Sequence, residues 1–171
     1  MNYATIKPWD IANGPGVRVS LFVSGCTHHC KDCFNPEAWD FDYGEPFTDA
    51  VMDHILNLLR PEYIRGITYL GGEPFDPHNQ PGLLELTRKI RAAYPEKSIW
   101  SFTGYVYGQN LPQLPGVTDA LLAGLDVLVD GPFIAARKNL GLRFRGSDNQ
   151  RLIDLPKTLK TGAVVLWDET Q

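Results

Sequence analysis

Three cysteines are the residues whose type and spacing most clearly indicate chemistry. Cys26, Cys30 and Cys33 fall within eight consecutive positions, and the rest of the 171-residue chain contains no cysteine. An odd number of thiols cannot pair completely, so a secreted disulfide framework is a poor interpretation. Three thiols this close together indicate a metal site in a reducing compartment, which predicts a cytoplasmic protein.

The spacing Cys26-x-x-x-Cys30-x-x-Cys33 lets a compact loop direct three thiolates at one iron-sulfur cluster. Four cysteines would saturate such a cluster or a zinc ion. Because the fourth is missing, one coordination position must be filled by another group or left open. An open iron is a position where a substrate or cofactor can bind directly.

A structural zinc site, formed by the cysteines with His28 or His29, is the alternative. Zinc ligands usually come from two separated pairs, whereas both histidines lie between Cys26 and Cys30 in a cramped loop. The spacing therefore favours a cluster. A zinc or electron-transfer module without catalytic activity stays open as the alternative class of protein.

The elements that must position this loop follow an alternating strand and helix pattern. Apolar residues alternate over residues 17–24, so the cysteines directly follow a strand. The remaining pattern predicts strands at 66–70, 98–103, 126–130 and 163–167, and helices at 48–60, 83–93 and 117–123. Such spacing suits βαβ crossovers and predicts a largely parallel sheet or partial barrel in a single domain, 1–171.

Ligands of parallel α/β folds bind at the carboxyl ends of the strands. The cysteine loop, Gly71-Gly72 and Gly104 each follow a predicted strand. We therefore expect these three segments to meet on one rim. A side chain at Gly72 is expected to collide with a ligand bound there.

Composition excludes several classes of protein. Hydrophobic residues make up 43% and charged residues 21%, as in ordinary globular domains. The net charge of −4 argues against nucleic-acid binding through overall charge. No run of about 18 apolar residues is present, which argues against a membrane span, and residues 1–10 lack the pattern of a secretory signal.

The cysteine triplet after one strand and Gly71-Gly72-Glu73-Pro74 after the next resemble the radical S-adenosylmethionine superfamily. Further segments resemble its glycyl-radical activating enzymes, in particular those that act on an anaerobic ribonucleoside-triphosphate reductase. These segments are residues 13–18, 24–36, 103–105, 130–133 and 144–151. One position departs from the superfamily, because Asp32 precedes the third cysteine where an aromatic residue is common, and Phe34 follows it.

This resemblance implies an open, partial parallel α/β barrel and a 4Fe-4S cluster held by Cys26, Cys30 and Cys33. It implies that S-adenosylmethionine binds the open iron and is cleaved reductively, so that a glycyl radical forms on the reductase. Backbone groups of Asp32, Cys33 and Phe34 are expected to contact the adenine. The carbonyls of Gly71 and Gly72 are expected to accept hydrogen bonds from the methionine ammonium, while Glu73 either assists that ammonium or stabilises the turn.

The implied partners are the reductase and an electron donor such as flavodoxin. Neither nucleic acid nor a membrane is expected as a partner. Seven acidic residues lie within residues 34–63, and seven basic residues lie within 137–160. Such segregation can steer a large partner. Another small radical S-adenosylmethionine enzyme, a deazaguanine-forming synthase or a different glycyl-radical activase, is the alternative enzyme.

Overall fold

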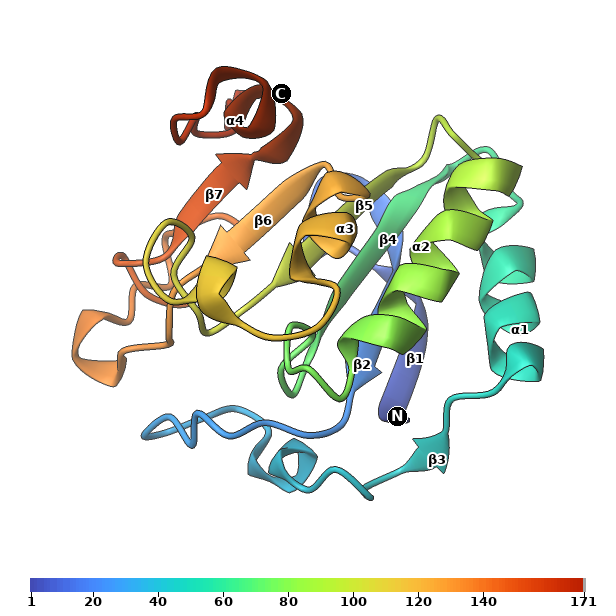
Figure 1. Cartoon of the computed structure of the whole chain (residues 1–171), viewed down its shortest axis with the longest axis horizontal. Coiled ribbons are helices and arrows are strands. Elements are labelled where there is room, and N and C mark those ends of the chain that lie inside the picture. Colours follow the sequence, from blue (N-terminus) through green and yellow to red (C-terminus); the bar gives the residue numbers. More distant parts are fainter. Residues whose placement is uncertain (171) are drawn as a thin grey trace.

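The computed structural model describes residues 1–170, which form one seven-stranded sheet with helices packed on it (Figure 1). The strands lie side by side in the order β3-β1-β2-β4-β5-β6-β7. Their bounds are β1 (Asn2–Asp10), β2 (Val17–Val23), β3 (Glu45–Pro46), β4 (Ile64–Gly71), β5 (Ser98–Phe102), β6 (Val127–Asp130) and β7 (Arg151–Asp154).

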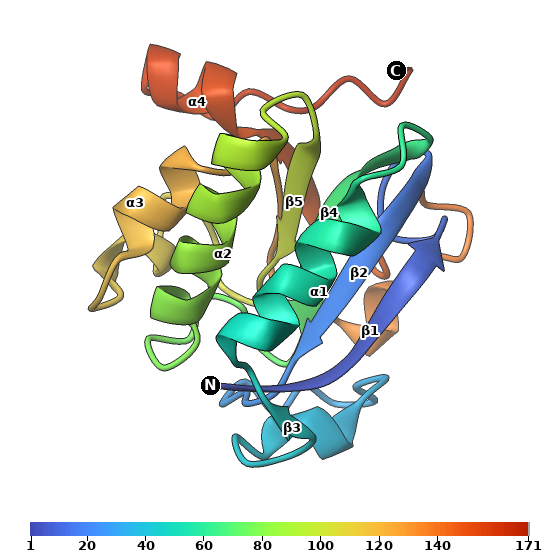
Figure 2. The ribbon, with the colours of Figure 1, turned by 90° about the vertical axis from the view of Figure 1, so that its right-hand side faces the viewer.

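Helices α1, α2 and α3 cover one face of this sheet (Figure 2). The α-helices are α1 (Asp49–Leu59), α2 (Gln80–Ala93), α3 (Thr118–Ala123) and α4 (Leu155–Thr161). Short 3-10 helices are η1 (Pro36–Trp39), η2 (Leu111–Gln113) and η3 (Ala135–Arg137). Within residues 1–170, no helix has the length and apolar character needed to cross a membrane.

The four central strands, β2, β4, β5 and β6, are parallel, whereas β1, β3 and β7 pair antiparallel at the two sides. The predicted α/β class with a parallel core is therefore confirmed. The pairing leaves the sheet open, because β3 and β7 each have a strand on one side only. The pairing does not establish the finer prediction, which was a partial barrel.

Helix α1 illustrates how local sequence sets these elements. Thr48 precedes it, and its hydroxyl accepts a hydrogen bond from the Val51 backbone N–H at 3.4 Å, as an N-cap residue does. Met52, Ile55 and Leu59 follow helical spacing and are buried against the sheet. Alternate residues of the strands, such as Leu21 of β2, complete the same core.

Several elements differ from the prediction. Strand β1, strand β7 and helix α4 are present where no element was predicted. The predicted strand at residues 163–167 is wrong, because only a single bridge, from Leu166 to Ile153, forms there. Gly162 ends helix α4 in a left-handed conformation. Beside the bridge, Trp167 donates its backbone N–H to the Leu152 carbonyl at 2.8 Å, and its ring packs on Trp100.

The sheet face opposite α1–α3 carries an aromatic cluster and a fully buried arginine. Trp100 packs there with Phe144 and Trp167. Arg18 of β2 lies beside it, with its guanidinium 5.5 Å from a Trp100 ring centroid. Burial lowers the pKa of Arg18 to about 10.

Arg18 helps to hold the β1–β2 loop in place. It donates to Thr68 Oγ1 (3.0 Å), to Ser98 Oγ (2.7 Å) and to the carbonyls of Ile67 (2.8 Å) and Ser98 (3.0 Å). Thr68 in turn donates its hydroxyl proton to the Asn13 carbonyl at 2.7 Å. Through Thr68, Arg18 connects three strands to the loop that contains Asn13.

We expect Arg18→Ala to lower the free energy of unfolding by about 3 kcal/mol. The change removes these hydrogen bonds, leaves buried acceptors unpaired and opens a void beside Trp100. Urea denaturation followed by circular dichroism measures the effect. Arg88→Ala on the exposed side of α2 is the control, and equal stabilities of the two variants would contradict the assigned role.

Candidate functional site

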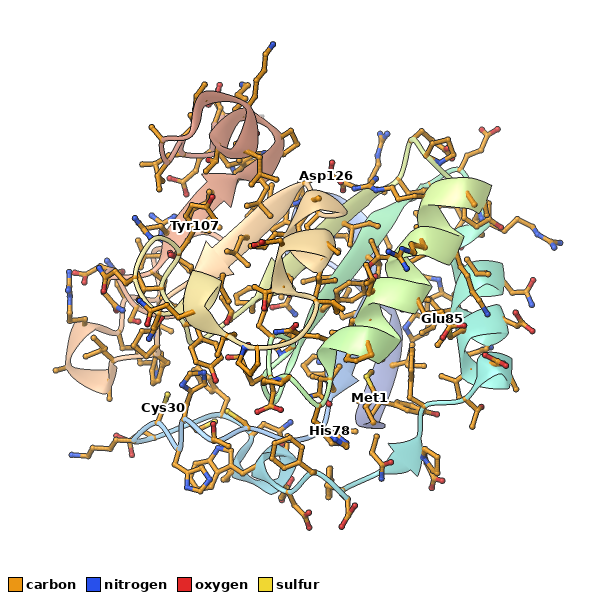
Figure 3. All side chains as sticks on the ribbon, viewed as in Figure 1. Met1, Cys30, His78, Glu85, Tyr107 and Asp126 are labelled. Atoms are coloured by element: carbon orange, nitrogen blue, oxygen red, sulfur yellow. The ribbon has the colours of Figure 1, made fainter. Side chains whose placement is uncertain are left out.

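A cavity of about 420 Å³ lies at the carboxyl ends of the central strands. The loop that follows β2 forms one side of it; we call residues 24–35 the cysteine loop. In Figure 1 this loop extends from the lower end of β2, and Figure 3 labels Cys30 on it. The cavity is lined by Cys26, Cys30, Cys33, Gly71, Gly72, Glu73, Thr103 and Gly104, among others.

The three cysteines all line this cavity, and each is partly exposed. The base of the loop is held by backbone hydrogen bonds from Gly25 N–H to the Ala38 carbonyl (2.7 Å) and from Cys26 N–H to the Trp39 carbonyl (3.2 Å). Helix η1, which contains these acceptors, thus closes the loop against the end of β2.

Burial disfavours bare thiolates at this site. Desolvation raises the pKa of Cys26 to about 11 and also raises the pKa of Cys30. The deprotonated sulfurs that coordinate a metal therefore need a bound cation to compensate the lost hydration. This behaviour fits ligands of a metal group better than free reactive thiols.

The glycine turn after β4 is hydrogen-bonded directly to the cysteine loop. The Gly72 N–H donates to the Val23 carbonyl, and the Glu73 N–H donates to the Gly25 carbonyl, both at 2.8 Å. Gly71 has φ 104, in the left-handed region that favours glycine. The predicted meeting of these two segments at one rim is therefore observed.

Glu73 is a buried carboxylate with a full set of donors. Its Oε1 accepts from the Phe75 N–H (2.8 Å) and the Thr103 hydroxyl (2.8 Å). Its Oε2 accepts from the Gly104 N–H (2.7 Å) and from Nε2 of His28 (2.7 Å). The side chain is only 1% exposed, so these protein groups occupy its acceptor positions.

The other residues of the predicted site differ in their placement. Cys33 and Phe34 line the cavity, whereas Asp32 is exposed and is not among the lining residues. Phe34 is 76% exposed and contacts the ring of Phe133, with centroids 5.3 Å apart. Lys138 lies over the Phe34 ring, 5.6 Å from its centroid.

The two histidines of the cysteine loop have partners other than the sulfurs. His28 bonds Glu73, and its ring lies edge-on to Tyr105 at 4.5 Å. His29 stacks on Trp39 with centroids 4.4 Å apart. Among residues 1–170, no three His, Cys, Asp or Glu side chains are grouped as ligands of a single metal ion.

Several lining residues were not predicted as site residues. The cavity is also lined by Asn13, His28, Trp39, Phe102, Phe133, Phe144, Arg145 and Gln150. Asn13, Phe133 and residues 144–150 belong to segments that carried the sequence resemblance, which is the signal that could have identified them. His28 also belongs to such a segment, residues 24–36, but its type and spacing did not indicate Glu73 as its partner.

The basic segment is largely neutralised by internal ion pairs. Four of its seven basic residues pair with carboxylates: Arg137 with Asp148, Arg145 with Glu169, Arg151 with Asp130 and Lys157 with Asp154. In contrast, all seven acidic residues of 34–63 are exposed. The acidic segment therefore presents more unpaired charge to a partner than the basic one does.

Comparison with known proteins gives consistent matches over most of the chain. Residues 12–153 match the family model of the 4Fe-4S single cluster domain. The chain is 44% identical over 152 residues to a protein of Escherichia coli K12, covering 88% of this chain and 96% of that protein. That relative is an anaerobic ribonucleoside-triphosphate reductase-activating protein.

Two further relatives carry the same name. The protein from Vibrio cholerae serotype O1 is 42% identical over 152 residues, covering 88% of this chain and 96% of its own. The protein from Enterobacteria phage T4 is 41% identical over 154 residues, covering 89% of this chain and 93% of its own. Bacterial and phage relatives thus share both length and name.

Proposed function

We propose that this protein generates a glycyl radical on an anaerobic ribonucleoside-triphosphate reductase. The chain belongs to the family of anaerobic ribonucleoside-triphosphate reductase-activating proteins and matches the 4Fe-4S single cluster domain. In this proposal it is a radical S-adenosylmethionine oxidoreductase. Residues 1–171 act as one domain in an anaerobic cytoplasm, and the open sheet serves as the partial barrel of the superfamily.

One observation carries the proposal: the three thiols and the glycine turn line the same cavity, and the loop that carries the thiols is hydrogen-bonded to that turn, from the Glu73 N–H to the Gly25 carbonyl. Three cysteine ligands leave one iron of a four-iron cluster without a protein ligand. A cavity of about 420 Å³ lies within the range that encloses a small organic ligand. The donor set therefore fits a 4Fe-4S cluster with S-adenosylmethionine beside it.

Cys26, Cys30 and Cys33 would hold the cluster in this site. When bound and reduced, it supplies the electron that cleaves the sulfonium of S-adenosylmethionine into methionine and a 5′-deoxyadenosyl radical. That radical takes a hydrogen atom from a glycine of the reductase, which yields 5′-deoxyadenosine and the glycyl radical.

The protein residues position the substrate and exclude water. The carbonyls of Gly71 and Gly72 would accept hydrogen bonds from the methionine ammonium. Backbone groups of Cys33 and Phe34, which line the cavity, would contact the adenine, whereas Asp32 lies outside the lining. Aromatic walls limit solvent access around the reacting groups; they are formed by Trp39, Phe102, Phe133 and Phe144.

The partners in this proposal are the reductase and an electron donor such as flavodoxin. The exposed Phe34 ring lies at the cavity, where a loop of the reductase could cover it. Because most of the basic segment is internally paired, the exposed acidic segment is the more effective source of long-range steering. A docking role for the basic segment would rest mainly on Lys138, Arg143 and Lys160.

An isotope experiment tests the proposed function. We expect deuterium placed on the glycines of the reductase to appear in 5′-deoxyadenosine when this protein, S-adenosylmethionine and a reductant are present. A glycyl radical should appear on the reductase in its electron paramagnetic resonance spectrum. Omitting this protein or S-adenosylmethionine is the control.

If deuterium stays on the reductase while a small heterocycle is converted efficiently, the protein is a different radical enzyme, such as a deazaguanine-forming synthase. Purified protein that binds zinc and no iron would instead support a structural module. The names of relatives at 41–44% identity favour the activating function over both.

A further inference from the structure

The cysteine loop needs contacts from outside to fix its shape. Residues 24–35 contain neither helix nor strand, and the backbone of His29 (φ 50) and of Asp32 (φ 58) is in the left-handed region. Within the loop, one backbone hydrogen bond joins the Cys33 N–H to the Cys30 carbonyl. The positions of the thiols therefore depend on where the loop is attached to the rest of the protein.

His28 provides such an attachment between the first and second cysteines. Its Nε2 donates to Oε2 of Glu73 at 2.7 Å, a bond across 45 positions of the sequence. Both groups are shielded, since the His28 side chain is 18% exposed and that of Glu73 is 1% exposed. A shielded hydrogen bond to a carboxylate is stronger than an exposed neutral one.

Glu73 is itself fixed from two strand ends. The Phe75 N–H holds it from its own turn after β4, and Thr103 and Gly104 hold it from the end of β5. Because these donors use its acceptor positions, Glu73 is better suited to holding His28 than to binding a ligand ammonium.

The imidazole of His28 also fits a space shaped for it. A Cβ on Gly104 would lie 2.6 Å from Cδ2 of His28, so only glycine leaves room for the ring. Tyr105 contacts the same ring edge-on at 4.5 Å. The ring is thus enclosed by Gly104 and Tyr105 and hydrogen-bonded to Glu73.

We propose that His28 and Glu73 are positioning residues. Their hydrogen bond fixes the cysteine loop against the ends of β4 and β5. It thereby sets the geometry of the thiols relative to Gly71 and Gly72. One consequence of this inference, a change in the affinity for S-adenosylmethionine, rests on the proposed function. The positioning of the thiols is a separate consequence, which the spectrum of the reduced cluster reports in the absence of that substrate.

The test compares anaerobically reconstituted proteins. We expect His28→Ala to keep the iron content of the wild type, because all three cysteines are present. Its reduced cluster should have an altered electron paramagnetic resonance spectrum without S-adenosylmethionine. Its dissociation constant for S-adenosylmethionine should rise about tenfold, as expected for the loss of one strong hydrogen bond.

Three variants separate positioning from a general structural effect. His28→Gln keeps an N–H donor at similar reach and should restore the wild-type spectrum and most of the affinity. Lys31→Ala changes an exposed residue of the same loop that does not line the cavity, and should leave both readouts unchanged. The effects of His28→Ala and Glu73→Ala on the spectrum should not add in the double variant, because each single change removes the same hydrogen bond.

A wild-type spectrum and affinity in His28→Ala would overturn the proposal. Equal losses in His28→Gln and His28→Ala would also overturn it, because the donor would then be irrelevant. Wild-type protein that binds iron but not S-adenosylmethionine would refute the proposed function, while the spectra of the substrate-free variants would still decide the positioning role.

Discussion

Each of the variants Cys26→Ser, Cys30→Ser and Cys33→Ser is expected to lose most of its iron and to form no detectable glycyl radical on the reductase. The chain contains only these three cysteines, so no spare thiol can replace a lost ligand. Serine offers a harder oxygen ligand that binds iron-sulfur clusters poorly. Because each cysteine lines the same cavity, the three losses should be similar.

Iron and sulfide content, the absorbance of the anaerobic protein and 5′-deoxyadenosine formation measure this loss. Lys31→Ala is a suitable control, since Lys31 is an exposed residue between two of the cysteines and does not line the cavity. Full activity in any one serine variant would remove that cysteine from the ligand set. Exposure of the wild type to air should also bleach its cluster, because accessible thiolates oxidise.

The central part of the fold was predictable because its strands carry strong local signals. Strand β2 alternates apolar residues and ends at Val23, two residues before Gly25, and helix α1 begins after a capping threonine and is amphipathic. These signals come from residues close in sequence, so they do not depend on the tertiary structure. They were sufficient to predict that the cysteine loop and the glycine turn meet at one rim.

The two sides of the sheet were not predictable by the same reasoning. Strand β1 contains Lys7 and Pro8, residues typical of an edge strand, and they obscure its pattern. Strand β7 has only four residues and passes directly into α4, whose start at Asp154 with Pro156 just inside it is a signal that was missed. Residues 163–167 have strand-like composition but form only the bridge between Leu166 and Ile153, and the Trp167 ring packs in the aromatic cluster.

Contacts within the site depend on tertiary structure. Nothing near His28 in the sequence indicates Glu73. The spacing favours a solvated or hydrogen-bonded histidine over a metal ligand but does not identify its partner. The burial of Arg18 was equally unpredictable, because arginine side chains are usually exposed. Hydrogen-bond acceptors on β4 and β5 explain why this one is fully buried. Both residues are polar groups whose burial is made possible by partners far away in the sequence.

Gly72→Ala is expected to lose iron as well as S-adenosylmethionine binding, and this result would correct the expectation from sequence. A side chain at Gly72 was expected to collide with the bound ligand. In the structure, a Cβ there would lie 2.5 Å from the Gly25 carbonyl oxygen and 2.9 Å from that of Ala38. The collision is therefore with backbone at the base of the cysteine loop.

Backbone atoms cannot move aside as a flexible side chain can, so the loop itself must shift. The Glu73 N–H bond to the Gly25 carbonyl lies at the same contact and would be strained with it. Overpacking of this kind costs about 1–3 kcal/mol, concentrated here on the segment that places Cys26. We therefore expect low iron content after reconstitution, measured together with the affinity for S-adenosylmethionine.

Gly108→Ala is the matched control for this prediction. Gly108 has φ 83, so alanine there carries backbone strain, but its Cβ would meet no atom within 4 Å. We expect normal iron content in Gly108→Ala and low iron content in Gly72→Ala. This pair of results would assign the loss of iron to the contact with the cysteine loop. If Gly72→Ala retains its iron and loses only S-adenosylmethionine, the ligand is the closer neighbour, and the sequence-based expectation was correct. Gly72 is not in the left-handed region, so alanine there carries no such strain and its effect comes from the close approach of the β4 turn to the loop that carries the cysteines.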